Sequence, residues 1–132
     1  MTMCAEAPGA VVELEHMGTV FSRFEDGRIA QRPFGGAGFP RTCYAADQTG
    51  HVLLHTLYER AVARGVRFYN EMVVTSLVVH QEQCHGVVVY DYRTGQLEPM
   101  AAKYCCFATG GYGQAFKITS NAAANTGDGI VA

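Results

Sequence analysis

Residues 77–104, LVVHQEQCHGVVVYDYRTGQLEPMAAKY, decide the fold of this chain. Two runs within this stretch, residues 84–92 and 96–104, are separated by the turn sequence Arg93-Thr94-Gly95, and the first of them is rich in valine and tyrosine. The preceding run, residues 66–80, has the same character and is long enough for two strands or for one bent strand. Because antiparallel strands can be joined by short turns, this part of the sequence predicts an antiparallel β-meander.

Two main helices are predicted in the first half of the chain. The first covers residues 5–17, with Pro8 near its start and Gly18 directly after its end. The second follows Asp47 or Thr49, either of which can cap a helix, and it stops at Gly65. Its apolar residues recur at helical spacing and form one stripe, made of Leu54, Leu57, Tyr58, Ala61 and Val62.

Shorter features lie between and after these elements. The dipeptide Asp26-Gly27 predicts a small β-hairpin from residues 21–24 and 28–31. Residues 33–40 contain too much glycine and proline for regular structure and predict a loop. Residues 105–109 predict one further short strand, and a helix is expected to begin near residues 126–129. The fold class is therefore α/β, with α+β character in this piece, as one domain or part of one.

Composition excludes several classes of function. The chain has 132 residues and a net charge of -2, and its basic residues are scattered, so we expect no nucleic-acid partner. Its apolar runs end well before the ~20 residues that a bilayer crossing needs, and its N-terminus lacks the pattern of a signal peptide.

The cysteines predict reduced thiols in a cytosolic compartment. Their number is odd and no C-x-x-C spacing occurs, which favours neither a disulfide framework nor a zinc site. Adjacent Cys105 and Cys106 lie in an apolar run, where a thiol usually behaves as a small hydrophobic group. The five cysteines are Cys4, Cys43, Cys84, Cys105 and Cys106.

Three glycine-rich segments could approach a ligand, because glycine lets backbone amides come close to phosphates. They are residues 34–38, 108–111 and 126–129. The second follows a predicted buried strand, and the third combines glycines with Asp128 at an expected helix start. Taken singly, each is more often an ordinary turn, and none has the G-x-G-x-x-G spacing of a dinucleotide fingerprint.

Catalytic and metal-binding patterns are not evident. His51 and His55 stand four residues apart on the second predicted helix, but no glutamate follows His51 and no third ligand is apparent. Surface or packing histidines are the favoured interpretation. No G-x-S-x-G elbow and no grouping of Cys, His and Asp predicts a nucleophilic triad, so we expect neither a catalytic residue nor a metal site.

Four stretches, taken together, change this interpretation. They are APGAVVELEHMGTVFSRFEDGRIAQRPFGG, RTCYAADQTGHVLLHTLYERA, FATGGYGQAF and NTGDG. In this order the sequence resembles the succinate dehydrogenase and fumarate reductase flavoprotein family over nearly its whole length. L-aspartate oxidase is similar in the helix, the ATGG segment and the TGDG turn, and it is the nearest alternative.

The resemblance implies that residues 1–132 form the second half of a Rossmann-like FAD-binding domain. By that resemblance the cofactor-binding residues are Val74 at the adenine, Thr109, Gly110 and Gly111 beside the dinucleotide, and Asp128 at the FAD. Phe34, Gly35 and Gly36 correspond to a loop at the dicarboxylate and the flavin ring. The family's dinucleotide fingerprint and flavin-linked histidine would lie before Met1, and its capping domain with substrate histidines and arginines beyond Ala132.

The implied activity is interconversion of succinate and fumarate by hydride transfer at FAD. Electrons would pass to an iron–sulfur subunit docked on a membrane anchor, which implies a cytoplasmic protein held peripherally on the inner face of the cell membrane. The isolated piece is expected to be inactive. The alternatives are a piece of an L-aspartate oxidase and a non-catalytic nucleotide-binding or scaffold module that acts alone.

Overall fold

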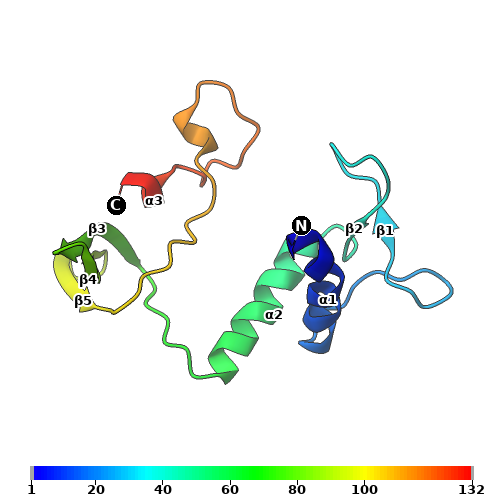
Figure 1. Ribbon diagram of the computed structural model, residues 1–132, viewed down its shortest axis with the longest axis horizontal. Coiled ribbons are helices and arrows are strands. Elements are labelled where there is room, and N and C mark those ends of the chain that lie inside the picture. The colour runs from blue at the N-terminus through cyan, green and yellow to red at the C-terminus, as the bar shows by residue number, and fades with distance from the viewer. Residues whose placement is uncertain (1, 132) are drawn as a thin grey trace. The chain divides into compact units, whose positions relative to one another are not determined.

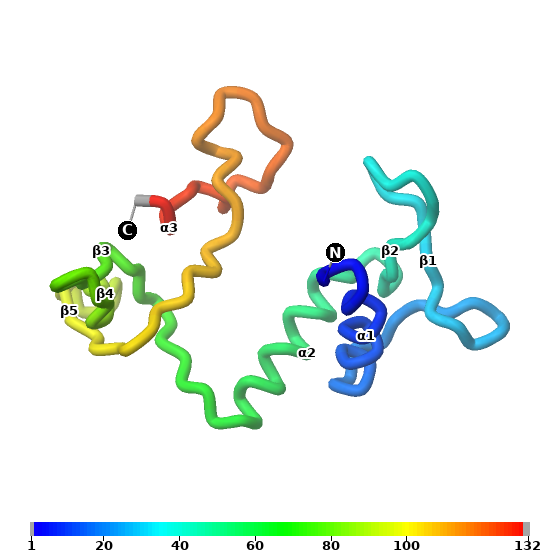
Figure 2. The backbone as a smooth tube through the Cα atoms, viewed as in Figure 1, coloured from blue at the N-terminus to red at the C-terminus, as the bar shows by residue number. Residues whose placement is uncertain are grey.

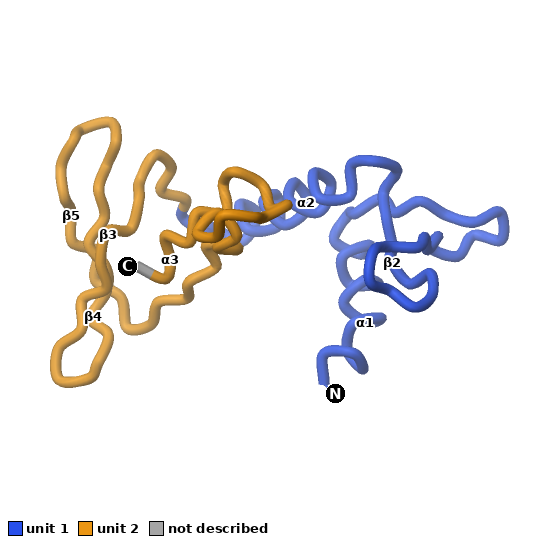
Figure 3. Tube along the Cα trace, turned by 90° about the horizontal axis from the view of Figure 1, so that it is seen from above, with its two compact units in different colours: residues 1–67 blue, residues 68–132 orange. Residues whose placement is uncertain are grey.

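The computed structural model describes residues 2–131, which fall into two compact units. The first unit comprises residues 1–67 and the second residues 68–132, as Figure 3 shows by colour. The first unit holds the two long helices and a two-stranded sheet, and the second holds a three-stranded sheet followed by irregular chain (Figure 1).

Both long helices predicted from the sequence are present. Helix α1 spans Thr2–His16 and accommodates Pro8, and helix α2 spans Thr49–Ala63. The predicted side-chain cap of α2 is wrong. The residue before α2 is Gln48, which makes no side-chain cap, and the Thr49 hydroxyl accepts a hydrogen bond from the Ala45 amide at 3.1 Å instead.

The predicted hairpin around Asp26-Gly27 is confirmed, although it is too short to form regular strands. The Phe24 amide donates to the Arg28 carbonyl at 2.9 Å, and the Ala30 amide donates to the Ser22 carbonyl at 2.8 Å. The chain then enters strand β1, Gln31–Arg32, which pairs antiparallel with strand β2, Thr42–Cys43. This pair closes the predicted loop of residues 33–40 at its base.

The core of the first unit is small. Phe21, Ala30 and Ala45 are buried, and the buried hydroxyls of Thr19 and Thr56 form a hydrogen bond of 3.1 Å between the chain after α1 and the middle of α2. The apolar stripe predicted on α2 is not the buried face. Its residues Leu54, Leu57 and Val62 are exposed among the described residues, whereas Thr56 on the other face is buried.

The second unit contains the predicted antiparallel meander. Strands β3, Met72–His80, β4, Gln83–Asp91, and β5, Gln96–Ala101, lie in the order β3-β4-β5 (Figure 1). The alternatives for residues 66–80 are resolved as one strand. This strand has two register irregularities against β4, one between Val74 and Ser76 and one between Val78 and Val79.

The turn between β4 and β5 is organised by Asp91. Its carboxylate accepts hydrogen bonds from the Arg93 amide at 2.8 Å and from the Arg93 guanidinium, and its carbonyl accepts from the Gly95 amide at 2.8 Å. The hydrogen bonds from Arg93 lower the pKa of Asp91. The Asp91 side chain is only 3% exposed, so its burial is offset by these charge-assisted bonds.

Gly86 lets strand β5 lie very close to β4 near the other end of β4. A Cβ on Gly86 would lie 2.0 Å from the Met100 carbonyl oxygen, and the φ angle of +138° is one that other residues rarely adopt. The close approach continues past the end of β5, where the Ala102 amide donates a hydrogen bond to the His85 carbonyl at 3.0 Å. The chain that leaves β5 is therefore held directly against the start of β4.

The strand predicted at residues 105–109 is wrong. This segment has no regular secondary structure in the described chain, because strand hydrogen bonds need a neighbouring strand and no described strand pairs with it. The path continues irregularly through the short 3₁₀ turn η1, Gly113–Ala115, to helix α3, Asp128–Val131 (Figure 2). The helix expected at residues 126–129 therefore begins at Asp128.

None of the helices within residues 2–131 is both long enough and apolar enough to span a bilayer.

Candidate cofactor site

Two of the glycine-rich segments meet in the second unit. A Cβ on Gly129 would lie 2.0 Å from the Thr109 Oγ1 atom, and a Cβ on Gly127 would lie 2.9 Å from the Tyr112 Cβ atom. Both distances are shorter than van der Waals contact, so glycine is needed at each position for the two segments to approach. The contact joins the ATGGYG segment to the TGDG turn.

Asn125 completes this junction and was not singled out by sequence reasoning. The Cβ position of Gly110 lies 3.5 Å from the Asn125 Oδ1 atom, and that of Gly111 lies 3.6 Å from its Cγ atom. The Asn125 carbonyl also accepts a hydrogen bond from the Gln114 amide at 3.0 Å. Its place directly before the TGDG turn is a signal, since Asn is one of the residues that order turns through local hydrogen bonds.

The Asp128 carboxylate is held but remains accessible. Its Oδ2 atom accepts a hydrogen bond of 2.9 Å from the Thr126 hydroxyl, and the residue is exposed at the start of α3. The Ile130 amide donates to the Gly127 carbonyl at 2.9 Å and closes the turn. A carboxylate has about four acceptor positions, so one internal bond leaves capacity for hydroxyl groups of a ligand.

Thr109 and Gly110 are exposed residues, and Gly111 is half-buried. Within the described residues, none of these three amides donates a backbone-to-backbone hydrogen bond. Gly110 has a φ angle of +80°, which turns the chain sharply at this point. Three successive amides at a glycine turn can donate to an anionic or hydroxylated ligand.

Val74 lies apart from this junction in the sheet of the same unit. It is half-buried in β3 and pairs with Val89 of β4, next to the first register irregularity. Because β3 is an edge of the described sheet, backbone groups on its outer side have no partner strand within the described residues. They can therefore bond to a ligand.

Phe34, Gly35 and Gly36 belong to the first unit. Phe34 is 63% exposed, and its carbonyl accepts a hydrogen bond of 3.0 Å from the Ala37 amide in a tight turn. No described atom lies within 4 Å of the Cβ positions of Gly35 and Gly36. The loop thus presents an aromatic side chain beside open space.

The two helical histidines lie close together without a metal-binding set. The ring centroids of His51 and His55 are 4.2 Å apart. Among residues 2–131, no group of three or more His, Cys, Asp or Glu side chains is arranged to hold a metal ion.

An antiparallel meander followed by two glycine-rich loops that pack together, with amides at residues 109–111 that donate to no described backbone carbonyl, is suited to binding a nucleotide cofactor. The family profile described as FAD binding domain matches residues 1–132, the whole sequence. The chain belongs to this FAD binding domain family.

Two relatives show which flavoproteins this chain is similar to. The chain is 44% identical over 135 residues to the succinate dehydrogenase flavoprotein subunit of Rickettsia felis, covering 96% of this chain and 23% of that protein. It is 45% identical over 127 residues to the fumarate reductase flavoprotein subunit of Mycobacterium tuberculosis, covering 96% of this chain and 22% of that protein.

A solved structure agrees with these relatives. The E. coli quinol fumarate reductase FrdA matches 96% of this chain with a TM-score of 0.87 and 32% identity, and the match covers 22% of that chain. The resemblance inferred from sequence motifs is therefore confirmed, and so is the mixed α/β fold class. The chain spans less than a quarter of the length of the relatives it matches.

FAD is the cofactor of this family, and the described residues fit it. In the glycine cradle of residues 109–111 and 127–129, the amides of residues 109–111 donate to no described backbone carbonyl, and Asp128 supplies an exposed acceptor. These two kinds of group match the phosphates and the hydroxyls of a flavin dinucleotide.

Proposed function

We propose that this chain is the second half of the FAD-binding domain of a flavoprotein that interconverts succinate and fumarate. The observation that carries the proposal is the close packing of the ATGG and TGDG segments at Thr109 and Gly129, which would form a glycine cradle for the cofactor. The names of the related flavoprotein subunits, which include both succinate dehydrogenases and fumarate reductases, supply the substrate pair.

In this function FAD supplies the hydride acceptor and donor. The protein's part in this chain is to hold and orient the cofactor. Thr109, Gly110 and Gly111 would donate backbone hydrogen bonds beside the dinucleotide, and Asp128 would accept from a cofactor hydroxyl. Val74, on the open edge of β3, would bond the adenine through its backbone. Holding a flavin in one orientation lowers the entropic cost of hydride transfer.

The loop of Phe34, Gly35 and Gly36 is proposed to lie at the dicarboxylate and the flavin ring. The exposed aromatic side chain would exclude water from the reacting carbons, and the two glycines leave room for a substrate. No catalytic residue is assigned within this chain, so the groups for proton delivery and carboxylate binding would belong to the capping domain of the complete protein.

The proposed partners follow from the relatives. These are flavoprotein subunits, and electrons would leave the flavin for an iron–sulfur subunit docked on a membrane anchor. The protein would then lie in the cytoplasm, on the inner face of the cell membrane, and attach to it through those partner subunits.

Two other functions compete with this one. A piece of an L-aspartate oxidase would share the helix, the ATGG segment and the TGDG turn, but it would oxidise an amino acid instead of succinate. A module that acts alone would bind a nucleotide without any turnover. All three predict a nucleotide at the same glycine cradle, so the substrate distinguishes them.

The test is to produce the complete polypeptide that carries this chain and to measure its flavin spectrum and its turnover. The proposal expects succinate-dependent dye reduction and fumarate reduction, both inhibited by malonate. Peroxide formation with L-aspartate and no reaction with succinate would identify the oxidase. Flavin or nucleotide binding without either reaction would support the module. Residues 1–132 alone are expected to show no succinate-dependent reduction.

A further inference from the structure

Cys84 and Cys105 bring their sulfur atoms together in the second unit. The two Sγ atoms are 3.5 Å apart and share a hydrogen bond, although the residues stand 21 positions apart in the sequence. Both cysteines are half-buried, and both are free thiols. Among the described residues, this is the cysteine pair whose sulfurs are joined by a hydrogen bond.

The fold holds this pair in place from both sides. Cys84 is fixed in β4 by its pairing with Val79 of β3. The segment that leads to Cys105 is tied to β4 where Ala101 pairs with Gly86 and where the Ala102 amide donates to the His85 carbonyl. At this pairing a Cβ on Gly86 would lie 2.9 Å from the Ala101 Cα atom, so the segment that leads to Cys105 lies directly against β4.

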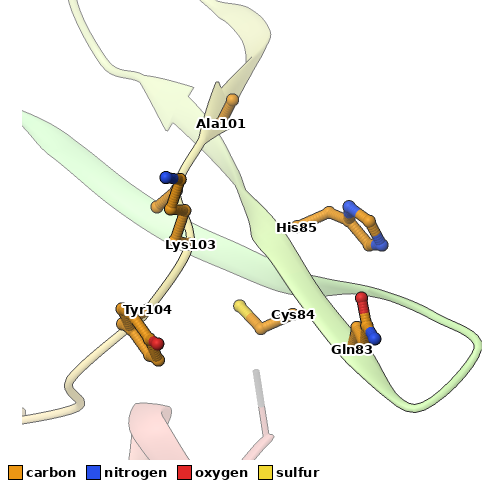
Figure 4. A pocket seen from close by; sticks show the side chains of 7 residues that line it. Gln83, Cys84, His85, Ala101, Lys103 and Tyr104 are labelled. Atoms are coloured by element: carbon orange, nitrogen blue, oxygen red, sulfur yellow. The ribbon is translucent and has the colours of Figure 1, made fainter.

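Of the two cysteines, Cys84 lines an open hollow that small molecules can enter. The hollow has a volume of about 700 Å³ and is lined by Cys84 with residues 83, 85 and 101–104. Figure 4 shows the Cys84 sulfur pointing toward the segment that carries Lys103 and Tyr104, whereas the His85 ring points away from it. Reactive thiols are typically partly exposed, as the half-buried Cys84 is at the edge of this hollow.

We propose that Cys84 and Cys105 form a peroxide-reactive thiol pair that closes into an intramolecular disulfide. The site is a modification site distinct from the glycine cradle, and it goes beyond the proposed flavin function. The substrate is hydrogen peroxide, which enters through the hollow beside Cys84.

The reaction has two balanced steps. In the first, the Cys84 thiolate attacks one peroxide oxygen, an S–O bond forms, the O–O bond breaks, and hydroxide leaves and becomes water. In the second, the Cys105 sulfur attacks Cys84, an S–S bond forms, the S–O bond breaks, and a second water is released. Two thiols lose two electrons in total, and one peroxide is reduced to two waters.

The order of attack follows from access and from protonation. Cys84 lines the hollow, so peroxide reaches its sulfur first. The hydrogen bond with Cys84, and then partial burial, raise the pKa of the Cys105 thiol. A thiol that keeps its proton to higher pH reacts slowly with peroxide but can still attack a sulfenic acid that lies in contact with it.

The disulfide is tested on the complete polypeptide that carries this chain, purified in reductant and then treated with one equivalent of hydrogen peroxide. Intact mass and peptide mapping should find a Cys84–Cys105 crosslink, with a mass loss of two hydrogens that dithiothreitol reverses. In Cys105→Ala, dimedone should trap a sulfenic acid at Cys84. The matched controls Cys4→Ala and Cys106→Ala, each of which removes an exposed thiol, should form the same crosslink as the parent.

Three outcomes would overturn the proposal. Cys84 and Cys105 could stay reduced while the exposed Cys4 and Cys106 are oxidised. The crosslink could join Cys84 to Cys106 instead. In Cys105→Ala, dimedone could label Cys106 in place of Cys84. Since the crosslink in the parent chain is measured without any substitution, a variant that folds poorly does not affect the central result.

Discussion

Gly129 packs against Thr109 so closely that a Cβ on Gly129 would lie 2.0 Å from the Thr109 Oγ1 atom and 3.0 Å from its Cβ atom. The two residues join the ATGG segment to the TGDG turn, and both segments are proposed to hold the flavin. A side chain at residue 129 must therefore separate them, which links the geometry of the junction to cofactor binding.

Gly129→Ala should lower flavin retention of the complete protein at least about tenfold, since moving one wall of a binding site costs ~1.4 kcal/mol or more. The measurement is the ratio of flavin to protein absorbance after gel filtration, with a titration of added FAD. The double variant Gly129→Ala with Thr109→Ala removes the hydroxyl that clashes and should recover part of the loss. Equal flavin content in Gly129→Ala and the parent would contradict the packing argument.

Asp128 is expected to hold FAD by accepting a hydrogen bond in addition to the one from Thr126. Loss of a hydrogen bond to a charged group costs ~1.5 to 3 kcal/mol, so Asp128→Ala should weaken FAD binding by roughly tenfold to a hundredfold or more. A simple helix cap would cost ~1 kcal/mol of stability and leave FAD bound. Asp128→Asn separates the two, because Asn caps well and accepts poorly. Unchanged FAD affinity in both variants would remove Asp128 from the site.

Phe34→Ala should impair substrate handling in the complete enzyme more than stability. The side chain is 63% exposed, so its removal leaves no large cavity and should change the unfolding free energy by less than about 1 kcal/mol. The measurements are kcat/KM for succinate and the melting temperature of the same preparation. A sharply lower melting temperature with unchanged kinetic constants would assign Phe34 to packing.

Gly86→Ala should destabilise the meander by at least about 2 kcal/mol, because the new Cβ would overlap the Met100 carbonyl oxygen and the φ angle of +138° would be strained. Urea unfolding followed by circular dichroism measures this. Gly9→Ala is the control: no described atom lies within 4 Å of that Cβ position in α1, and alanine should stabilise the helix by ~0.5 to 1 kcal/mol. Equal urea midpoints of unfolding for the two variants would refute the close packing of β5 against β4 at Gly86.

Asp91 should make stability depend on pH in the acid range. Hydrogen bonds from Arg93 lower its pKa in the folded protein, below the value of about 3.9 in an unfolded chain. Its contribution is therefore full above about pH 4 and is lost as the pH falls through the lower folded value. Asp91→Asn should reduce stability above pH 4, and the difference from the parent should shrink below it.

The control for this pH dependence is Asp26→Asn. Asp26 forms the same kind of pair with Arg28 two residues later, and the hydrogen bonds lower its pKa as well, but its side chain is 48% exposed. Exposed ion pairs contribute little, so this variant should unfold almost like the parent across the same pH range. A pH profile of Asp91→Asn that runs parallel to that of the parent would show that Asp91 does not act through its charge.

The sequence by itself determined the elements whose signals are local. Arg93-Thr94-Gly95 between two predicted strands specified the β4–β5 turn, and Gly65 after an amphipathic run specified the end of α2. The motifs QRPFGG, ATGGYG and TGDG were enough to indicate the family and FAD, because glycine is costly to replace where a backbone must approach a ligand or another backbone.

Only the tertiary structure decided which residues meet and which faces are covered. Most of the apolar stripe predicted on α2 is exposed, and residues 105–109 form no strand, because burial and strand pairing depend on neighbours that a local pattern does not specify. The approach of Gly129 to Thr109, and of Cys84 to Cys105, joins residues about twenty positions apart. Such contacts need small or compatible residues where the segments meet, but which residues meet depends on the path of the chain between them, including the close pairing of β5 with β4 at Gly86 and the turn at Asn125.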